Sequence, residues 1–578
     1  MPHRSHLFSL RIAHALRESC LGEIYTRERF GKDLLAGLTV GIIAIPLSMA
    51  LAIASGVAPQ YGLYTAIISG FLIALTGGSR FSISGPTAAF VVILYPIANQ
   101  YGLGGLLLAS VMAGCMLIGM AVLRLGRLIE YIPEAVTLGF TGGIAIVIAT
   151  LQLKDFMGVN IAEMPEHYVN KLVVLFQHLP QTSWPSVAVA GLTLLLMFAW
   201  PRLKTAVPPH LPAVIIGSLL SLWFIHHGYH VDTIGSRFTY QLPGGLTGNG
   251  IPPYLPAFTW PWHQPGPEGK AFVFSWQLVM DLLPAAFAIA MLGAIESLLC
   301  AVVLDGMTGK RHSANSELLG QGIGNVITPF FGGITATAAL ARSAANFKAG
   351  AQSPISAMIH ALVVLSGLVF LAPLLAWLPM PALAGMLIVV AWNMSEARKS
   401  VHLVKTAPLG DIVVFFTCLF LTVFFDMVIA ITAGILLSTL LFMKDIAAMT
   451  KVVDITHHPR LVAKALPEGW LVFRISGPLF FAAADRVFSE LALLAEKHQG
   501  VILYMEDVPM IDAGGLSALN KLVEQGRRDG MQIWLTDLQL QPRKALEHAR
   551  IKPITGLLSF YPGLPDALSE FHVHYDVA

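Results

Sequence analysis

The sequence predicts a polytopic α-helical membrane protein followed by a soluble α/β domain. Three observations support this fold class. The mean hydropathy is +0.69 and only 12% of the residues are charged, about half the charged share of ordinary soluble domains. Apolar stretches long enough to cross a bilayer recur between residues 34 and 443. Residues 447–578, by contrast, hold 28 of the 70 charged residues.

The apolar stretches predict fourteen membrane spans, of which the two near residues 86 and 342 are short. We place the spans near residues 34–55, 61–78, 86–99, 103–124, 129–153, 186–201, 209–226, 276–304, 314–330, 342–353, 355–377, 381–395, 410–426 and 428–443.

The distribution of Lys and Arg predicts the orientation. If the N-terminus is cytoplasmic, the inward loops contain eleven of these residues and the outward loops four, as the positive-inside rule requires. An odd number of spans would remove this agreement, so we expect both termini in the cytoplasm. The expected domains are an N-terminal cytoplasmic segment (1–32), a transmembrane transport domain (33–446) and a cytoplasmic domain (447–578). Residues 1–32 carry interspersed charges, which predicts an amphipathic helix at the membrane face rather than a signal peptide.

A weak internal repeat relates the two halves of the membrane part. Asp33-Leu34-Leu35-Ala36 opens the first span and Asp281-Leu282-Leu283-Pro284 opens the eighth. Fifteen residues after each Asp lie Ser48 and Glu296. Seven spans per half is an odd number, so the halves insert with opposite topology. A 7+7 inverted repeat with paired short segments is typical of secondary transporters.

The two short segments are interpreted as half-helices. In the first, residues 82–90, Ser84 or Gly85 is expected to cap the helix and Pro86 to occupy its first turn. The second covers residues 335–346, and small or β-branched residues precede both helix starts. Two helix N-termini meeting at mid-membrane would direct free N–H groups and positive dipole ends to one point, which favours an anion. The alternative is a pair of ordinary kinked helices.

Two charged residues in the spans are candidate functional residues. Arg342 lies in the second short segment, where a cation requires a partner or water. The alternative is that its side chain extends to an interface. Glu296 lies deep in the eighth span among apolar neighbours, where a carboxyl group can carry a proton. Its alternative role is a static salt bridge, with Arg342 as one partner.

After Lys444 the pattern changes to alternating strands and helices. Strands are predicted at 469–475, 500–505 and 531–536, and helices at 484–496, 516–527 and 543–549. This pattern indicates one helical layer over a mostly parallel sheet. No glycine-rich phosphate loop is present, so no nucleotide site is expected. The four cysteines show no CxxC spacing, and neither a metal nor a cofactor is expected.

Several motifs resemble the sulfate permease (SulP) family of anion transporters. Residues 41–64, with Pro46 and the run from Pro59 to Tyr64, are similar to the opening signature of that family. Gly85-Pro86 and Ala341-Arg342-Ser343 resemble its two half-helices, and the C-terminal part resembles its STAS domain. Within the family, the similarity is greatest to bacterial transporters of four-carbon dicarboxylic acids, on the stretches 130–133, 294–300 and 305–309.

The resemblance implies an elevator-type mechanism in which a core of spans 1–4 and 8–11 moves against a gate of spans 5–7 and 12–14. The substrate would lie between the third and tenth spans, and Glu296 would couple protons. The implied substrate-binding positions are Leu47, Leu51, Thr87, Ala341, Arg342 and Ser343. The resemblance also implies a homodimer with contacts involving the STAS domain.

The STAS resemblance includes one departure. Phosphorylatable relatives carry Asp-Ser-Ser-Gly at the turn where this sequence has Asp512-Ala513-Gly514-Gly515. Because neither middle residue has a hydroxyl group, this turn cannot be phosphorylated there. The domain is therefore expected to be a docking or assembly module with an unknown cytoplasmic protein partner.

Three functional hypotheses remain open. The first is a proton-coupled symporter of a bacterial inner membrane that imports succinate, fumarate, malate or aspartate. The second is a sulfate or bicarbonate transporter, with sodium as a coupling option. The third is a membrane-anchored STAS scaffold. An enzyme is not expected, because no nucleophile–base pair or phosphate loop emerges, and the net charge of +2 gives no case for nucleic-acid binding.

Overall fold

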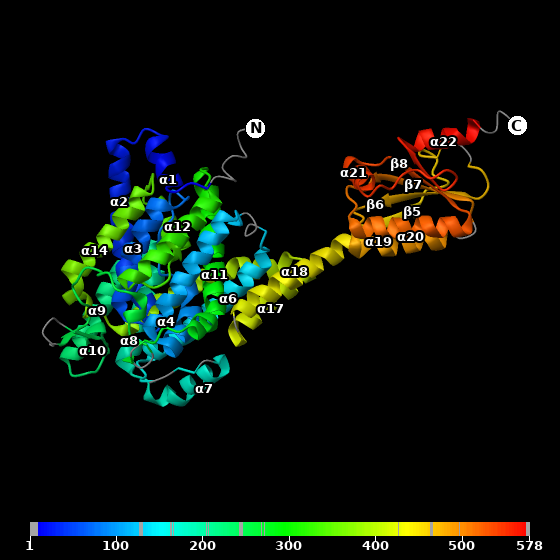
Figure 1. Ribbon diagram of the computed structural model, residues 1–578. Helices are drawn as coiled ribbons and strands as arrows, with labels where there is room; N and C mark the ends of the chain where they lie inside the picture. The colour runs from blue at the N-terminus through cyan, green and yellow to red at the C-terminus, as the bar shows by residue number, and fades with distance from the viewer. Residues whose placement is uncertain are drawn as a thin grey trace. The chain divides into compact units, whose positions relative to one another are not determined.

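The structure is a computed structural model in which the chain forms two compact units, Met1–Ile435 and Leu436–Ala578 (Figure 1). It describes residues 10–126, 131–161, 164–165, 167–203, 205, 207–241, 247–266, 269–270, 272–425, 427–462, 466–495 and 498–573. The first nine residues of the predicted N-terminal segment, Glu130 of the 130–133 stretch and residues 574–578 lie outside the described residues.

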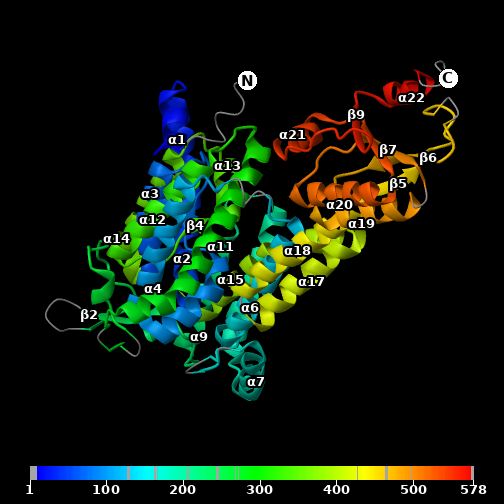
Figure 2. The ribbon, with the colours of Figure 1, turned by 45° about the vertical axis from the view of Figure 1, so that its right-hand side comes forward.

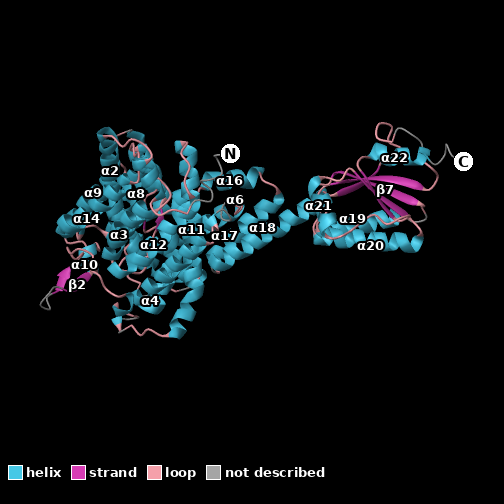
Figure 3. Ribbon diagram, turned by 45° about the horizontal axis from the view of Figure 1, so that its top comes forward, coloured by secondary structure: helices cyan, strands magenta, loops and turns pink. Residues whose placement is uncertain are grey.

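The first unit is mostly helical, as predicted (Figure 3). The fourteen predicted spans correspond to thirteen helices, the last of which continues past Ile435: α2 (Arg27–Ala54), α3 (Pro59–Thr76), α4 (Ala88–Val122), α6 (Glu134–Met157), α8 (Trp184–Ala199), α9 (His210–His226), α11 (Trp276–Thr308), α12 (Ala314–Ile327), α13 (Leu340–Lys348), α14 (Ile355–Leu375), α15 (Met380–Met394), α17 (Leu409–Phe424) and α18 (Met427–Met449). Helix α4 supplies two spans, because Gly102 breaks it with φ 68°. Eight helical stretches of the described residues are long and apolar enough to cross a membrane on their own.

The helices pack into two groups. Helices α2, α3, α4, α11, α12, α13 and α14 contact one another, and so do α6, α8, α9, α15 and α17. Figures 1 and 2 show α2, α3, α12 and α14 side by side, and α6 beside α17. Gly434 of α18 packs on Cys418 and Val136, so that α18 joins the second group. This division reproduces the predicted core and gate.

Two short strands in the first group confirm the half-helix prediction. Strand β1 (Ser84–Gly85) pairs antiparallel with β4 (Thr337–Ala338). Helix α4 starts at Ala88, three residues after β1, and α13 starts at Leu340, two residues after β4. The two halves of the core therefore meet at one antiparallel crossing, with a helix N-terminus on each side.

One detail of that prediction is wrong. The N-cap position of helix α4 is Thr87, whose backbone is extended at φ −126° and ψ 155°, so neither Ser84 nor Gly85 occupies it. Pro86 precedes the helix instead of occupying its first turn, because Ser84 and Gly85 are held in the β1–β4 pair.

Elements outside the spans were not predicted. They include α7 (Tyr168–His178), α10 (Ile234–Arg237), the hairpin β2 (Thr239–Gln241) and β3 (Thr247–Asn249), and the amphipathic α16 (Ala397–Thr406). In the described part of the predicted N-terminal segment, α1 (His14–Leu16) and η3 (Arg17–Leu21) form one short continuous helical stretch before α2, and its location at a membrane face stays a prediction. Backbone bonds from Ala13 and Ala15 to the end of α3 hold this stretch in place.

The second unit contains a five-stranded sheet. Its order is β5 (Lys451–Asp454), β6 (Trp470–Ser476), β7 (Gly500–Asp507), β8 (Gln532–Thr536) and β9 (Leu558–Tyr561). Strand β5 is antiparallel to β6, and the other neighbours are parallel. The three predicted strands and the predicted mostly parallel sheet are confirmed, whereas β5 and β9 were missed.

Helices cover both faces of this sheet, so the prediction of a single helical layer is wrong. Helices α19 (Phe481–Leu494), α20 (Ala513–Asp529) and α21 (Leu540–His548) bury one face, which includes Phe473 and Leu503 (Figure 3). On the other face, Trp470, Trp534 and their neighbours pack with α22 (Leu564–Val573). Side chains alternate across a strand, so apolar residues at consecutive positions of β6 require a cover on both sides.

Candidate functional site

The crossing of β1 and β4 fixes the backbone of the candidate site. The Ser343 hydroxyl accepts a hydrogen bond from the Ile83 N–H at 2.9 Å. The Ala339 N–H donates to the Ile83 carbonyl at 2.9 Å. Ser343 is fully buried and thus connects α13 to the residue before β1.

Arg342 lies beside this crossing with most of its hydrogen-bonding capacity unused. Its side chain is 4% exposed, and Nη2 donates to the Pro86 carbonyl at 2.5 Å. Nε and Nη1 have no partner among the described residues. An ideal Cβ on Gly85 would lie 3.0 Å from Nη1, so a glycine at position 85 makes room for the guanidinium. Burying unpaired guanidinium N–H groups is unfavourable, which indicates that an anion or water completes this site.

A second polar contact near the crossing, besides that of Arg342 with Pro86, joins Glu296 to Thr87. The Thr87 hydroxyl donates to Oε2 of Glu296 at 3.1 Å, so that the N-cap of α4 is joined to α11. The Thr337 hydroxyl donates to the Gly293 carbonyl at 3.0 Å and links β4 to the preceding turn of α11. Among the described residues Arg342 forms no ion pair with Glu296, so the static salt bridge considered from the sequence is absent from this structure.

The remaining predicted positions contribute no polar contact of this kind. Leu47 and Leu51 lie one turn apart on α2, 7% and 2% exposed, and can offer only an apolar wall. Ala341 is exposed next to Arg342. The structure thus brings Thr87, Glu296 and Arg342 to the two sides of one crossing.

Three polar residues of α12 support the crossing and were missed. Gln321 donates to the Ser84 hydroxyl and to the Glu317 carboxylate, both at 3.0 Å. Glu317 accepts bonds from the N–H groups of Gly78 and Ser79. The Asn325 carboxamide pairs with both the N–H and the carbonyl of Ala336, each at 2.8 Å. The sequence signal was the presence of these polar side chains among the glycines of this span.

A fourth missed residue is His360 of α14. Its side chain is fully buried, and neither ring nitrogen has a partner among the described residues. If Gly70 carried a Cβ atom, that atom would lie 3.6 Å from the His360 ring and 3.2 Å from the Ser84 carbonyl oxygen. Both groups therefore adjoin Gly70, which places His360 near the backbone of β1.

A cavity of about 620 Å³ lies beside α11. Its lining extends from Arg311 and His312 in the α11–α12 loop to Ile295, the neighbour of Glu296 in the sequence, with Thr137 of α6 on the opposite wall. The cavity therefore lies between a core helix and a gate helix.

Comparisons with known proteins identify the family. Residues 30–418 match the model of the sulfate permease family, which is more than half of the chain. The chain belongs to the sulfate permease family. Residues 462–567 match the STAS domain, which accounts for the second unit.

Relatives and solved structures agree with this assignment. The chain is 37% identical over 542 residues to YvdB of Bacillus subtilis, named as a candidate sulfate transporter, covering 93% of this chain and 97% of that one. It is 26% identical over 567 residues to the bicarbonate transporter BicA of Picosynechococcus, covering 94% and 95%. The structure of the murine anion transporter Slc26a9 in its inward-facing state has the same fold, with a TM-score of 0.82 at 18% identity, covering 97% and 94%.

Membership of the sulfate permease family settles the functional class. The chain is a multi-pass membrane transporter of anions with a C-terminal STAS domain, and it is not an enzyme. The hypothesis of a mere membrane-anchored scaffold is not retained, because the membrane part itself matches the transporter family. The substrate, the coupling ion and the roles of individual site residues stay predictions.

Proposed function

We propose that this anion transporter imports small dicarboxylates such as succinate, fumarate, malate or aspartate together with protons. The observation that supports the proposal is the buried Arg342 guanidinium, which has two nitrogens without a partner beside the N-termini of α4 and α13. A planar guanidinium fork matches a carboxylate in geometry and charge. The helix N-termini add donors and positive potential at the same point.

The preference for dicarboxylates rests on sequence motifs. The stretches 130–133, 294–300 and 305–309 resemble bacterial transporters of four-carbon dicarboxylic acids. One substrate carboxylate would occupy the Arg342 fork, and the second would extend toward Thr87.

Glu296 is the proposed proton carrier. Its carboxylate accepts a hydrogen bond from the Thr87 hydroxyl, toward which the second substrate carboxylate would extend. An ionised Glu296 would repel a dianion, and protonation would remove this repulsion. Binding of the substrate and of a proton would then favour each other, which is the requirement for symport.

The proposed mechanism is of the elevator type. The site residues Thr87, Glu296 and Arg342 all lie on core helices, so the core can carry a bound anion as one body along the gate. The cavity between α11 and α6 would be the exit of the path on one side of the membrane.

Sulfate or bicarbonate is the second candidate substrate, with sodium as a coupling option. The names of two relatives, YvdB and BicA, favour these anions, and a guanidinium fork binds sulfate as well as carboxylate.

The same site residues could bind any of these anions, so an uptake assay must distinguish between them. Labelled succinate, sulfate and bicarbonate would be supplied to proteoliposomes containing the full chain, with a pH gradient or a sodium gradient imposed separately. Succinate accumulation driven by the pH gradient is expected. Sulfate or bicarbonate uptake without succinate uptake would contradict the proposed substrate, and dependence on sodium alone would contradict proton coupling.

We further propose the membrane location and assembly implied by the sequence. The protein would lie in a bacterial inner membrane with both termini cytoplasmic, supported by the Lys and Arg distribution. It would form a homodimer, and its STAS domain would dock a cytoplasmic protein.

A further inference from the structure

Helix α7, which follows the gate span α6, exposes apolar side chains and buries its charged one. Val169, Val173 and Phe176 lie on one face of the helix and are 54%, 47% and 68% exposed; we call them the apolar stripe. Lys171 is the only Lys, Arg, Asp or Glu in α7, and it is just 7% exposed. A surface helix in water has the opposite arrangement. The apolar stripe therefore requires an apolar cover.

A polar edge borders the apolar stripe. It consists of Asn170 and Gln177, which are both exposed and lie two turns apart on the same side of the stripe. On the other side of the stripe lie Leu172 and Leu179. The free surface of α7 thus changes from apolar to polar around the helix. This arrangement is typical of a helix that lies at the boundary between acyl chains and water.

Helix α7 is attached to an exposed aromatic side of span α17. Tyr168, the first residue of α7, packs edge-to-face on Phe424, with 5.5 Å between the ring centroids. Phe424 in turn contacts Phe420 at 4.8 Å between centroids, and both phenylalanines are exposed near the end of α17. Because α17 is one of the spans, exposed phenylalanines on it are expected to face acyl chains. Lipid is therefore the apolar medium next to α7.

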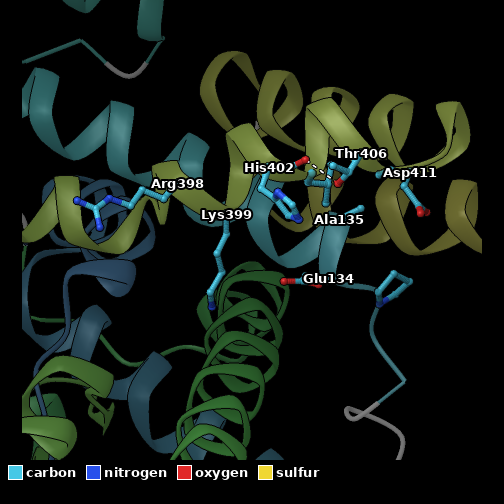
Figure 4. Close-up of a pocket in the computed structure, with 10 residues that line it drawn as sticks. Glu134, Ala135, Arg398, Lys399, His402, Thr406 and Asp411 are labelled. Atoms are coloured by element: carbon cyan, nitrogen blue, oxygen red, sulfur yellow. Dashed lines mark hydrogen bonds between the residues drawn. The ribbon is translucent and has the colours of Figure 1, made fainter.

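The position of α7 also fits a membrane surface. The helix contacts α6 and α17 and runs across the ends of the spans rather than alongside them (Figure 1). At its other end, α17 is preceded by α16, which exposes the basic side chains of Arg398, Lys399 and His402 (Figure 4). The two short helices of the gate thus expose different surfaces, and only α7 exposes an uncharged apolar stripe.

We propose that α7 lies in the headgroup layer of one leaflet, with its apolar stripe inserted among the acyl chains and its polar edge toward water. The distribution of Lys and Arg predicts that this is the outer leaflet. The helix would hold the adjoining ends of α6 and α17 at the membrane surface. The proposal does not depend on the transported anion or on the coupling ion.

Spin-label accessibility in the full chain tests the proposal. Cys20 and Cys115, which are not buried, are replaced by Ser. A single nitroxide-labelled cysteine is then placed at each position of the apolar stripe and the polar edge, in vesicles of phosphatidylethanolamine and phosphatidylglycerol. Labels on the stripe should be severalfold more accessible to oxygen, which concentrates among acyl chains, than to a nickel complex dissolved in water. Labels on the polar edge should show the reverse order.

A polar double variant tests whether the stripe holds the helix in lipid. Val173→Gln with Phe176→Gln should abolish the oxygen preference of a label at Val169. The matched control is Val401→Gln with Val404→Gln, which changes two exposed valines of α16 and should leave that label unaffected. An unchanged oxygen preference in the α7 double variant would contradict the proposal.

Two other outcomes would overturn it. A preference for the nickel complex at every labelled position would show that α7 lies in water. Dipolar broadening between stripe labels of two chains would show that a second copy of the chain covers the stripe instead of lipid. Because the readout is spin-label accessibility, the result is independent of any uptake assay.

Discussion

At the scale of single residues, the candidate site depends on where hydrogen bonds are satisfied and where they are not. Glu317, Gln321 and Asn325 are buried side chains whose bonds hold loop and strand backbone in place. Arg342 is buried to a similar degree but leaves two nitrogens unpaired. Gln321 Oε1 and both ring nitrogens of His360 also lack a partner among the described residues, so Arg342 is distinguished by its charge and by its place beside the N-termini of α4 and α13.

Arg342→Ala should weaken substrate binding much more than it weakens folding. Loss of a charge-assisted contact costs roughly 1.5–3 kcal/mol, which corresponds to about a ten- to hundredfold loss of affinity. Arg342→Lys should recover part of the charge but not the fork, and Thr87→Ala should cost only about 0.5–1.5 kcal/mol. Substrate titration of the purified variants measures these effects. Unchanged affinity in a folded Arg342→Ala protein would show that the helix N-termini alone hold the anion.

Glu296→Gln should abolish uphill accumulation driven by a pH gradient while sparing exchange of substrate. The amide can still accept the Thr87 hydrogen bond, but it cannot carry a proton. Glu317→Ala is the control variant. It removes the acceptor of the Gly78 and Ser79 N–H groups, so it should lower thermal stability rather than remove proton coupling. Accumulation and exchange are measured in the same proteoliposomes. Uphill uptake by Glu296→Gln would refute the proton role.

At the scale of elements, the segment of residues 10–26, here called the N-terminal clasp, holds the ends of several core helices together. Arg80, in the loop after α3, contacts Glu18 at 3.2 Å and Glu23 at 2.8 Å. Lys310, after α11, contacts Glu23 at 3.1 Å. The Tyr25 hydroxyl donates to Asp33, which also accepts bonds from the residues before α14. The clasp therefore joins elements from both halves of the repeat.

The clasp should make stability depend on pH below the ordinary carboxylate range. The hydrogen bond from Arg80 lowers the pKa of Glu23 from 4.5 to about 2. Because the folded pKa lies below the unfolded one, the stabilisation is complete above pH 4.5 and is lost as the pH falls toward 2. The difference in melting temperature between the parent chain and Glu23→Gln should thus be constant above pH 4.5 and shrink below it.

Glu28→Gln is the matched control for this measurement. Glu28 forms an exposed pair with Lys32 on the first turn of α2, and exposed pairs of this kind contribute little. A melting difference for Glu23→Gln that does not change with pH would contradict the role assigned to its ion pairs.

At the scale of the whole molecule, the two units have separate cores. The spans satisfy their own backbone hydrogen bonds, and the STAS unit buries its apolar side chains on the two faces of its own sheet.

A chain that ends at Met449, which keeps α18 complete, should therefore fold and elute as a single species from a sizing column. Transport or assembly should fall, because the expected docking module is removed. Aggregation of the shortened chain would contradict independent folding. A pull-down with the isolated tail then tests for the cytoplasmic partner, and absence of a specific partner would favour an intramolecular role.

The sequence by itself determined the spans, the half-helices, the core–gate division implied by the resemblance and the central strands of the STAS unit. Apart from the core–gate division, which came only from the family resemblance, these features depend on hydropathy, periodicity and turn residues over short windows, which the chain displays locally. The cap of α4 was predicted wrongly, because the β1–β4 pair overrides the local preference.

Only the tertiary structure decided which polar groups meet. Arg342 binds the carbonyl of Pro86, 256 positions away, and Gln321 binds Ser84 across 237 positions. The Thr87–Glu296 bond spans 209 positions. No local pattern encodes such pairs, since they arise when the two halves of the repeat pack with opposite orientation. The sequence could therefore name Thr87, Glu296 and Arg342, but the unpaired nitrogens of Arg342 and the polar support from α12 exist only where the halves cross.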